Sequence, residues 1–237
     1  MIPIKILSQP DDTTCGPTSL HAVYNYYHDP ISLEQVIREI IYLETGGTLE
    51  VLLGCHALRR GYQATIYTYN LNIFDPIWFS IKKTDMVAKL ERQLAAKGGE
   101  KLRIATEAYI EFIRLGGKIA FKDLTSSLLN GFFKRGRPVL TGLSATYLYQ
   151  SSREYTGSSN KAVYDDIGGY PCGHFVVLCG YDEEHKLIVV ADPYAANPVS
   201  KNNYYSVKAS RLINSIMLGI ATHDANLLII EPYAAGN

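Results

Sequence analysis

The first half of the chain carries apolar residues at the three- and four-residue spacing typical of helices. This spacing predicts a helix over residues 17–28, with one apolar face formed by Leu20, Val23, Tyr24 and Tyr27. Further helices are predicted over residues 33–44, 49–60, 84–97, 101–115 and 123–135. Residues 62–69 alternate between apolar and polar side chains and predict a strand among these helices.

Two of these helices have recognisable capping residues. Ser32 stands three positions before Gln35, which is the spacing of a capping box, so we expect it to cap the second helix. That helix is expected to continue through Ile41, and its apolar face consists of Leu33, Val36, Ile37, Ile40 and Ile41. Thr48 is expected to cap the third helix, which Gly61 would end.

The second half of the chain changes to short β-rich runs separated by turn residues. Strands are predicted over residues 138–144, 174–182, 186–193, 204–207 and 226–232. Helices followed by such strands indicate the α+β class, with N-terminal helices packed on a C-terminal antiparallel sheet. Because no low-complexity linker divides the chain, residues 1–237 are expected to form a single domain.

A long segment rich in serine, glycine, asparagine and tyrosine, residues 144–173, separates the first two of these strands. A loop of this length inside a compact domain is usually functional or disordered. Because the segment ends next to His174, we expect it to act as a lid over a substrate cleft.

Composition narrows the possible functions. Of the 237 residues, 47% are apolar and 19% are charged, as in an ordinary globular protein. The 23 lysines and arginines balance the 23 aspartates and glutamates, so no overall field would attract nucleic acid or an anionic membrane. No window predicts a membrane span, and the N-terminus does not have the apolar segment of a signal peptide. The four cysteines favour free thiols in a reducing, cytoplasmic setting over a disulfide framework.

Cys15 lies where the chain changes from turn to helix. Residues 11–14 before it are turn and cap formers, and Pro17 after it suits a first helical position. The partial positive charge of the unpaired amides at a helix N-terminus favours a thiolate over a thiol. A structural cysteine would more often lie within the apolar face of the helix, so this position favours a reactive nucleophile.

A nucleophilic cysteine needs a base, and the base needs a third group that orients it. Of the six histidines, His174 differs from the others because it begins a buried strand. Residues 174–193 predict a hairpin, and a turn centred on Glu183 would place Asp192 directly opposite His174 on one face of an unbulged ladder. Directly opposed side chains have Cβ atoms about 4.5–5.5 Å apart, which lets a carboxylate accept a hydrogen bond from an imidazole.

Gln9 is the candidate for the remaining part of the site. A side-chain N–H of Gln9 beside the backbone amide of Cys15 would stabilise the negative charge that develops on an attacked carbonyl oxygen. In the predicted mechanism, Asp192 fixes the tautomer of His174, and His174 forms an imidazolium–thiolate pair with Cys15. The thiolate attacks an acyl carbon, His174 protonates the leaving amine, and water hydrolyses the thioester. This chemistry uses no cofactor.

Cys172, His174 and Cys179 also raise the question of a zinc site. Their spacing is not that of a structural zinc motif. In an extended strand, Cys179 would also point away from His174, five positions before it. We therefore expect no metal at this place.

Three stretches of the chain together match a known pattern: "QPDDTTCGPTSL" at residues 9–20, "GHFVVLCGYD" at 173–182 and "VVADPY" at 189–194. They resemble the double-glycine (bacteriocin-processing) peptidases, family thirty-nine of the cysteine peptidases, which share the papain-like fold. The resemblance implies that Cys15 is the nucleophile and His174 the base. It also implies that Asp192 orients the base and that Gln9 is the oxyanion donor. It also implies a peptide or protein substrate, with a Gly-Gly type of cleavage site as one option. The layout is similar to that of stand-alone relatives without a fused transporter.

Two other functional classes stay open at this point. The same residues could catalyse acyl transfer without chain cleavage, as in a glutamine deamidase, an amidase or a transglutaminase. Ammonia release or amine incorporation would favour that class. The chain could also be a catalytically inactive peptide-binding module, which an unreactive Cys15 would indicate.

Overall fold

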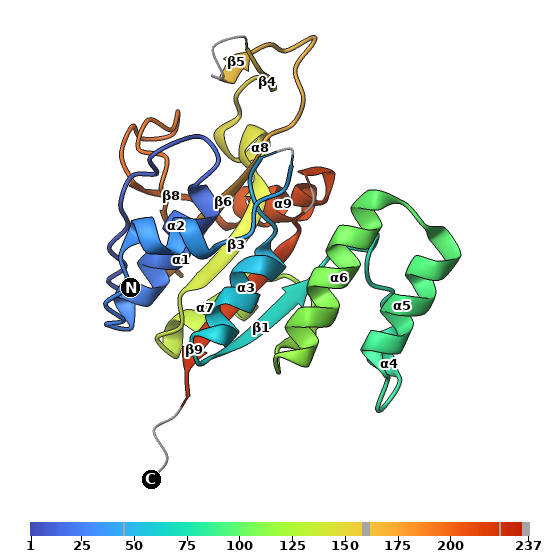
Figure 1. Ribbon diagram of the computed structural model, residues 1–237. Coiled ribbons are helices and arrows are strands. Elements are labelled where there is room, and N and C mark those ends of the chain that lie inside the picture. The colour runs from blue at the N-terminus through green and yellow to red at the C-terminus, as the bar shows by residue number, and fades with distance from the viewer. Residues whose placement is uncertain (45, 158–161, 223, 234–237) are drawn as a thin grey trace.

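A seven-stranded sheet forms the centre of the molecule (Figure 1). The computed structural model describes residues 1–44, 46–157, 162–222 and 224–233. The strands follow the order β2-β1-β9-β3-β6-β7-β8, in which β1 and β2 are parallel and the other neighbours are antiparallel. Their bounds are β1 Tyr62–Thr68, β2 Lys118–Ala120, β3 Val139–Ser144, β6 Gly173–Asp182, β7 Leu187–Ala191, β8 Tyr204–Lys208 and β9 Asn226–Pro232.

Helices cover both faces of this sheet. The mixture of helices with a mainly antiparallel sheet confirms the predicted α+β class, although the helices are not confined to one side. One face carries α1 (Cys15–Tyr26), α2 (Leu33–Glu39), α3 (Glu50–Arg59), α4 (Ile77–Ser80), α5 (Met86–Lys97) and α6 (Glu100–Arg114). The other face carries α7 (Ser126–Lys134), α8 (Ala145–Tyr149) and α9 (Ala209–Leu218). We call the apolar cluster under α1 and α3 the first core and the cluster under α7 and α9 the second core.

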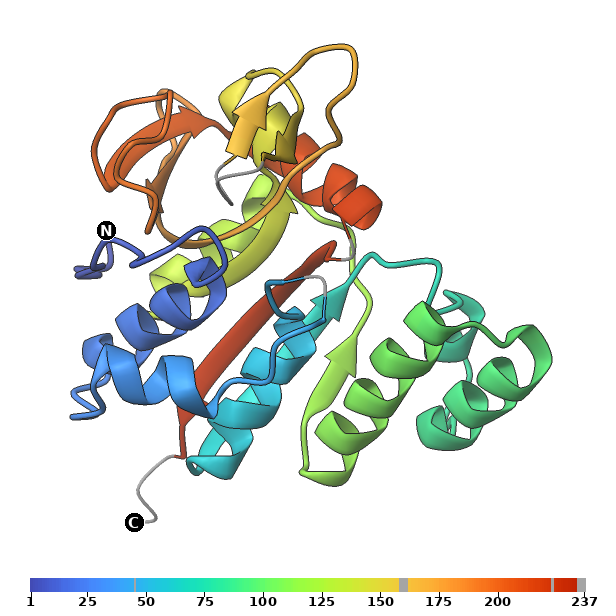
Figure 2. The ribbon, with the colours of Figure 1, turned by 45° about the horizontal axis from the view of Figure 1, so that its top comes forward.

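The helical hairpin of α5 and α6 lies at the β1–β2 edge of the sheet, away from β7 and β8 (Figure 2). Its inner side is held by aromatic packing, because the fully buried ring of Phe112 faces α3 and the ring of Tyr109 meets Phe74 edge-on at 4.8 Å. The sequence predicted both helices because their apolar residues recur at helical spacing. The two glycines at residues 98 and 99, both at positive φ, separate them.

The second helix is shorter than the sequence predicts. Ser32 does cap it, because its Oγ accepts a hydrogen bond from the amide of Gln35 at 3.2 Å. The helix ends at Glu39, however, and Ile40 takes an extended conformation while the side chain of Ile41 is exposed. From this extended backbone the side chain of Ile40 is buried in the first core, and this tertiary contact outweighs the apolar spacing on which the prediction rested.

The predicted cap of the third helix is wrong. The hydroxyl of Thr48 donates to the carbonyl of Ile41 at 2.7 Å, and Leu49 occupies the capping position without a side-chain hydrogen bond. The first amide of α3, on Glu50, instead donates to the carboxylate of Asp224 at 3.2 and 3.3 Å. A residue 174 positions away therefore satisfies this helix end, which local sequence reasoning has no means of detecting.

The segment of residues 144–173 contains secondary structure that the sequence did not predict. It begins with α8 and continues into a small two-stranded sheet of β4 (Glu154–Thr156) and β5 (Ala162–Tyr164), drawn above the main sheet in Figure 1. We call residues 150–172 the insertion, of which the structure describes 150–157 and 162–172. The strand β2, the helices α4 and α9, and the short 3₁₀ helix η1 (Gly219–Thr222) were also not predicted.

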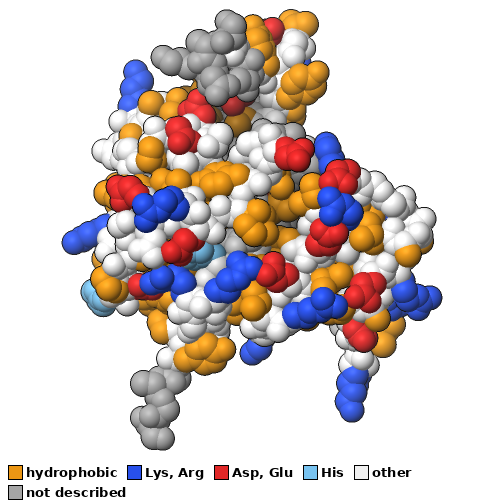
Figure 3. Space-filling model, in the orientation of Figure 1, with side chains coloured by type: hydrophobic (Ala, Val, Ile, Leu, Met, Phe, Trp, Pro, Cys, Tyr) orange, Lys and Arg blue, Asp and Glu red, His pale blue; other side chains and the backbone are white. Residues whose placement is uncertain are grey.

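The surface shows no large area of one charge on the face drawn in Figure 3, where acidic and basic side chains are interspersed. This agrees with the balanced composition of the chain. In the parts of the chain that the structure describes, no helix has both the length and the apolar character needed to cross a bilayer.

Candidate active site

Cys15 is the first residue of α1, and only 9% of it is exposed. The residue before it, Thr14, makes no capping hydrogen bond with its side chain, so the positive end of the helix stays available to the thiol. A Cβ atom on Gly16 would lie 2.9 Å from Thr48 and 3.2 Å from Phe175. Glycine at this position therefore lets the start of α1 approach strand β6, to which Ser19 also donates a hydrogen bond.

His174 and Asp192 meet from neighbouring strands. His174 is the second residue of β6, and Asp192 directly follows the last residue of β7. The imidazole Nε2 and the carboxylate Oδ1 are 2.8 Å apart, and both side chains are buried, Asp192 completely. The structure thus forms the contact that the hairpin argument predicts.

The strand pairing that brings these two side chains together differs from the prediction. The observed ladder pairs Tyr181 with Ile188 near the turn and Val177 with Ala191 further along, so Asp192 is not directly opposite His174. The register shifts between Leu178 and Gly180, which makes Cys179 the extra residue of a β-bulge. The predicted unbulged ladder is therefore wrong.

The bulge decides on which side of the sheet His174 lies. Tyr181, Ile188 and Val190 face the second core, and Asp192 follows Val190 on the same side by the alternation of β7. Regular alternation from Tyr181 along β6 would turn His174 to the opposite side. The extra residue at the bulge reverses this order, so Val177 joins the first core and His174 shares the side of Asp192.

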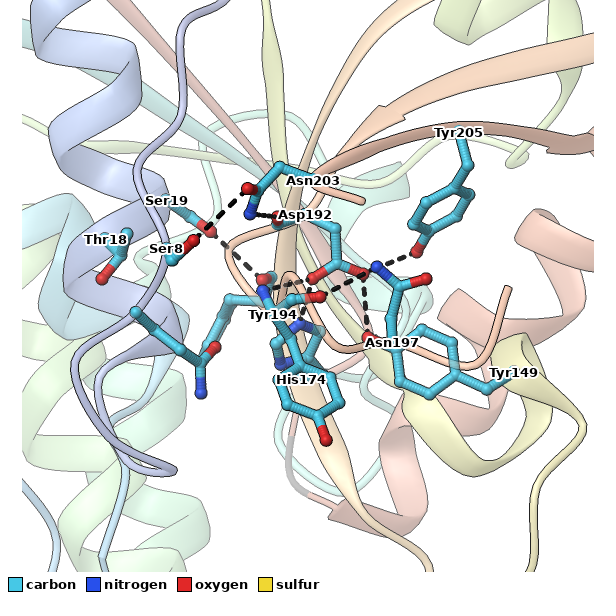
Figure 4. Close-up of polar contacts among 12 residues, drawn as sticks. Ser8, Thr18, Ser19, Tyr149, His174, Asp192, Tyr194, Asn197, Asn203 and Tyr205 are labelled. Atoms are coloured by element: carbon cyan, nitrogen blue, oxygen red, sulfur yellow. Dashed lines mark hydrogen bonds and ion pairs between the residues drawn. The ribbon is translucent and has the colours of Figure 1, made fainter. Parts of the chain in front are cut away.

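The carboxylate of Asp192 accepts hydrogen bonds at both oxygens (Figure 4). Oδ1 accepts from His174 and from the backbone amide of Tyr194, each at 2.8 Å. Oδ2 accepts from the hydroxyls of Tyr149 at 2.8 Å and Tyr205 at 2.7 Å. An ionised carboxylate has about four acceptor positions, so all of them are used and the side chain has one well-defined orientation.

The charges of this group support one another. Burial alone would disfavour the imidazolium, but the negative charge and hydrogen bond of Asp192, followed by the contact with Cys15, raise the pKa of His174 to about 10. Burial likewise disfavours the carboxylate, yet the charge of His174 and the hydrogen bonds from His174, Tyr205 and the Tyr194 amide lower the pKa of Asp192. The pair is therefore most stable with His174 protonated and Asp192 ionised.

Cys15 is the third member of this group. Its thiol lies within hydrogen-bonding reach of the imidazole of His174. Because Nε2 of the ring is bound to Asp192, Nδ1 is the nitrogen that remains for Cys15. A thiol, an imidazole and a carboxylate in this order can transfer a proton from sulfur to nitrogen and keep the resulting imidazolium in place.

Gln9 lies beside this group, but its side chain turns toward its own loop. Its backbone amide donates to the carbonyl of Pro193 at 2.9 Å, which ties the N-terminal segment to the residue after Asp192. Its side-chain Nε2 donates to the carbonyl of Asp11 at 2.8 Å. The second N–H of the same amide group remains for another acceptor, so the role of Gln9 as an oxyanion donor stays a prediction.

Cys15 and His174 line a cleft of about 610 Å³. One wall comes from the loop before α3, and the other comes from the insertion, which contributes Tyr155, Tyr170 and Cys172 among others. The expected position of residues 144–173 next to the cleft is therefore observed. In the described parts of the chain, no cluster of three or more histidine, cysteine or acidic side chains could hold a metal ion.

Residues 114–214 match the model of the Peptidase_C39 like family. This stretch contains His174 and Asp192, while Cys15 and Gln9 lie before it. This part of the chain is therefore similar to the C39-like peptidases. No curated protein sequence gives a significant match to the chain.

Several solved structures are similar to this chain. A C39-like peptidase from Bacillus anthracis superposes with a TM-score of 0.51 at 13% identity, over 99% of this chain and 97% of the other. Xylellain, a cysteine protease from Xylella fastidiosa, gives 0.45 at 14% identity, over 99% and 85%. A double glycine motif protease from an AMS/PCAT transporter, in complex with the leader peptide, gives 0.44 at 16% identity, over 98% and 93%. The first of these likenesses supports the papain-like fold of the chain.

Sequence reasoning missed the residues that hold Asp192 in place. Tyr149 comes from α8 and Tyr205 from β8, and the side chain of Asn203 donates to the carbonyl of Asp192 at 2.7 Å. Burial first, and then the charge of Asp192, raises the pKa of both tyrosines, so they remain neutral donors at all ordinary pH values. Nothing in the sequence separates these two from the other sixteen of the 18 tyrosines.

Removing one of these hydroxyls should reduce turnover moderately. We expect Tyr205→Phe to lower kcat about fivefold to tenfold with little change in KM, because Asp192 loses one of its charge-assisted hydrogen bonds. The same change should raise the pKa of Asp192 and move the acid limb of the pH–rate profile upward. Steady-state kinetics over a pH series measures both effects.

Tyr204→Phe is the matched control for this experiment. Tyr204 neighbours Tyr205 in β8, but its hydroxyl contacts the backbone of Ile4 and Ile6 and not Asp192. Its loss should leave kcat and the pH profile unchanged. Equal effects of the two substitutions would contradict a positioning role for Tyr205.

Proposed function

We propose that the chain hydrolyses a peptide or isopeptide bond, with Cys15 as nucleophile, His174 as general base and acid, and Asp192 as the orienting carboxylate. The observation that carries this proposal is the buried His174–Asp192 pair beside Cys15, in a cleft large enough for several residues of a peptide. We further propose that residues 1–237 act as a single domain, and that the free thiols suit a reducing, cytoplasmic setting.

The geometry suggests how each group would act. The raised pKa of His174 keeps the imidazole protonated at neutral pH, which favours a thiolate on Cys15 ready to attack the carbonyl carbon. As the tetrahedral intermediate forms, its oxygen would be stabilised by the backbone amide of Cys15 at the start of α1 and by the Gln9 side chain. Loss of the amine follows, with His174 donating the proton, and water then attacks the thioester while His174 accepts a proton.

The cleft and the similarity to C39-like peptidases both support a peptide as the substrate. A cleft of about 610 Å³ that is lined by chain segments on both sides suits an extended peptide. One of the similar structures is described as a complex with a leader peptide, which makes peptides ending in Gly-Gly suitable first substrates.

The proposal is tested by the rate at which Cys15 is alkylated at pH 6, measured by mass spectrometry of the labelled peptides. We expect rapid labelling of Cys15 in the wild type and at least about tenfold slower labelling in His174→Gln, which keeps the side-chain volume but not the charge. Cys172 serves as an internal reference, since it lines the same cleft and burial, followed by contact with Glu154, raises its pKa far above the usual value.

Two results would count against the proposed catalytic pair. One is labelling of Cys15 no faster than that of Cys172 in the wild type, and the other is an unchanged labelling rate of Cys15 in His174→Gln. Either result would favour the inactive binding module. Ammonia release without chain cleavage from a glutamine-containing peptide would favour the deamidase alternative instead.

A further inference from the structure

A second acidic site lies in the cleft, apart from the group around His174. Asp224 stands between η1 and β9, lines the same cleft as Cys15 and His174, and is 8% exposed. Its carboxylate accepts from the backbone amide of Glu50 and from the side chain of Asn226. Asp224 therefore faces the cleft while its other side is fixed to the body of the protein.

Two glycines make room for Asp224. A Cβ atom on Gly142 would lie 2.6 Å from the Cβ atom of Asp224, and a Cβ atom on Gly219 would lie 2.0 Å from its backbone oxygen. Larger residues at either position would displace the aspartate. Close packing around Asp224 thus fixes the position of its carboxylate next to strand β3.

Capping of α3 explains part of this arrangement, but it does not explain Glu50. The Glu50 side chain is completely buried, and neither of its carboxylate oxygens has a hydrogen bond of good geometry, although the amides of Gly142 and Leu228 lie near them. The Oδ1 atom of Asn226 is buried without a partner as well. A helix cap needs one short polar side chain, so a second buried carboxyl group and an unpaired amide oxygen need another reason.

Among the described residues, no positively charged side chain contributes to the environment of the two carboxyl groups. Burial raises the pKa of Asp224 to about 7. Burial, and next the charge of Asp224, raises the pKa of Glu50 well above its usual range. Both carboxyl groups therefore lose a proton less readily than exposed acids, and a cation bound beside Asp224 would favour its ionised form.

The rest of the described cleft lining is also acidic. Among the residues described in its lining, Asp12, Glu44 and Glu154 are acidic like Asp224, and none is lysine or arginine. Among these described lining residues, a cation that entered the cleft would meet one side chain able to carry a positive charge, His174, and a largely buried carboxylate at Asp224. Charge–charge attraction is strong at such a partly desolvated position.

We propose that Asp224, supported by Glu50 and Asn226, is the subsite that binds a lysine or arginine side chain of the peptide substrate. The inference deepens the proposed function and rests on it, because it takes the ligand of the cleft to be a peptide. The cationic group would donate to the Asp224 carboxylate from the cleft and place a positive charge beside the two buried acids. Peptides with a basic residue at one fixed distance from the cleaved bond would then be preferred.

The experiment uses the full chain with Cys15→Ala, which can bind a peptide without cleaving it. A randomised heptapeptide library is passed over this variant, and the retained peptides are sequenced. A retained peptide with lysine is then compared with the same peptide containing norleucine, a neutral residue of similar length. We expect lysine or arginine to be enriched at one position and the lysine peptide to bind at least about tenfold more tightly.

The matched comparison adds Asp224→Asn to the same background. Asparagine keeps an oxygen that can cap α3 but removes the charge, so the preference for lysine over norleucine should fall to nearly one. Glu44→Gln removes an exposed cleft carboxylate and should reduce the preference much less. Asp224→Ser, which also keeps a capping oxygen, replaces Asp224→Asn if that variant does not fold.

The outcomes separate this inference from the proposed hydrolysis. The cation subsite would be overturned if the retained peptides showed no enrichment in lysine or arginine, or if the preference for lysine over norleucine survived Asp224→Asn. It would also be overturned if millimolar Ca²⁺ removed this preference and EDTA restored it. If the wild type cleaves no retained peptide but Asp224→Asn still removes the preference, the proposed hydrolysis fails and the subsite stands. If peptides are cleaved with no preference for basic residues, hydrolysis stands and the subsite fails.

Discussion

Cys15→Ala is expected to lower kcat/KM for peptide hydrolysis at least about a thousandfold. Alanine keeps the start of α1 and its packing but removes the atom that would form the thioester, so the covalent route is lost entirely. Peptide binding should remain, because the cleft keeps its other lining residues. Cleavage of a confirmed substrate, followed by mass spectrometry of the products, measures the loss.

Cys172→Ala is the matched control for this substitution. Cys172 lines the same cleft, only two residues before His174, and its thiol contacts the carbonyl of Gly173. If Cys15 is the nucleophile, this variant should retain most of the wild-type activity. Activity that survives Cys15→Ala but disappears in Cys172→Ala would show that Cys172 is the nucleophile. The proposed mechanism would then be wrong.

The second large effect is expected at Asp192. Asp192→Ala should lower kcat at least about a hundredfold, because His174 loses the only hydrogen bond that the structure describes between its Nε2 atom and the protein. The hydroxyls of Tyr149 and Tyr205 would also lose their acceptor inside the protein. An unpaired buried hydroxyl costs roughly 1–3 kcal/mol, so a lower free energy of unfolding should accompany the loss of activity.

Asp192→Asn separates orientation from charge. Its side-chain oxygen can still accept from His174 and the Tyr194 amide, and the two tyrosine hydroxyls can rotate to accept from the new amide group. The negative charge that raises the pKa of His174 is gone, however, so this pKa should fall from about 10 toward its ordinary value of 6.5. The alkaline limb of the pH–rate profile should move down with it, while kcat at pH 6 falls less than in Asp192→Ala.

The free energy of unfolding gives an independent check of the same shift. Because the pKa of His174 is higher in the folded than in the unfolded protein, its proton stabilises the fold fully below about pH 6.5. This stabilisation is lost as the pH rises through about 10. Urea unfolding of the wild type between pH 6 and pH 10 should show the loss, and Asp192→Asn should show less of it. Identical slopes would contradict the assigned charge state of His174.

The parts of the site that the sequence predicted depend on local rules. Cys15 could be placed at a helix start because turn residues and Pro17 mark that start. His174 and Asp192 could be paired because a hairpin turn keeps its two strands adjacent, whatever their register. The register itself could not be predicted, since a bulge at Cys179 leaves no distinct mark among consecutive apolar residues.

The parts that the sequence did not predict depend on contacts between distant segments. Tyr149 and Tyr205 reach Asp192 from a helix and a strand that have no common motif with it. Asp224 caps α3 across most of the chain, which also explains why the local choice of Thr48 failed. In each case the donor or acceptor type is common, and only the folded topology selects one residue over the others of its type.

The bulge at Cys179 has a consequence for recognising distant relatives from sequence. Here the histidine and the aspartate are 18 positions apart, and one of those positions is the extra residue of the bulge. A relative with the same turn and a regular ladder would bring the two side chains together with one residue fewer between them. Its alignment would then show a single-residue gap inside the most apolar strand of the hairpin. A search pattern with a fixed spacing would reject such a homologue, whereas a pattern that permits this gap would retain it.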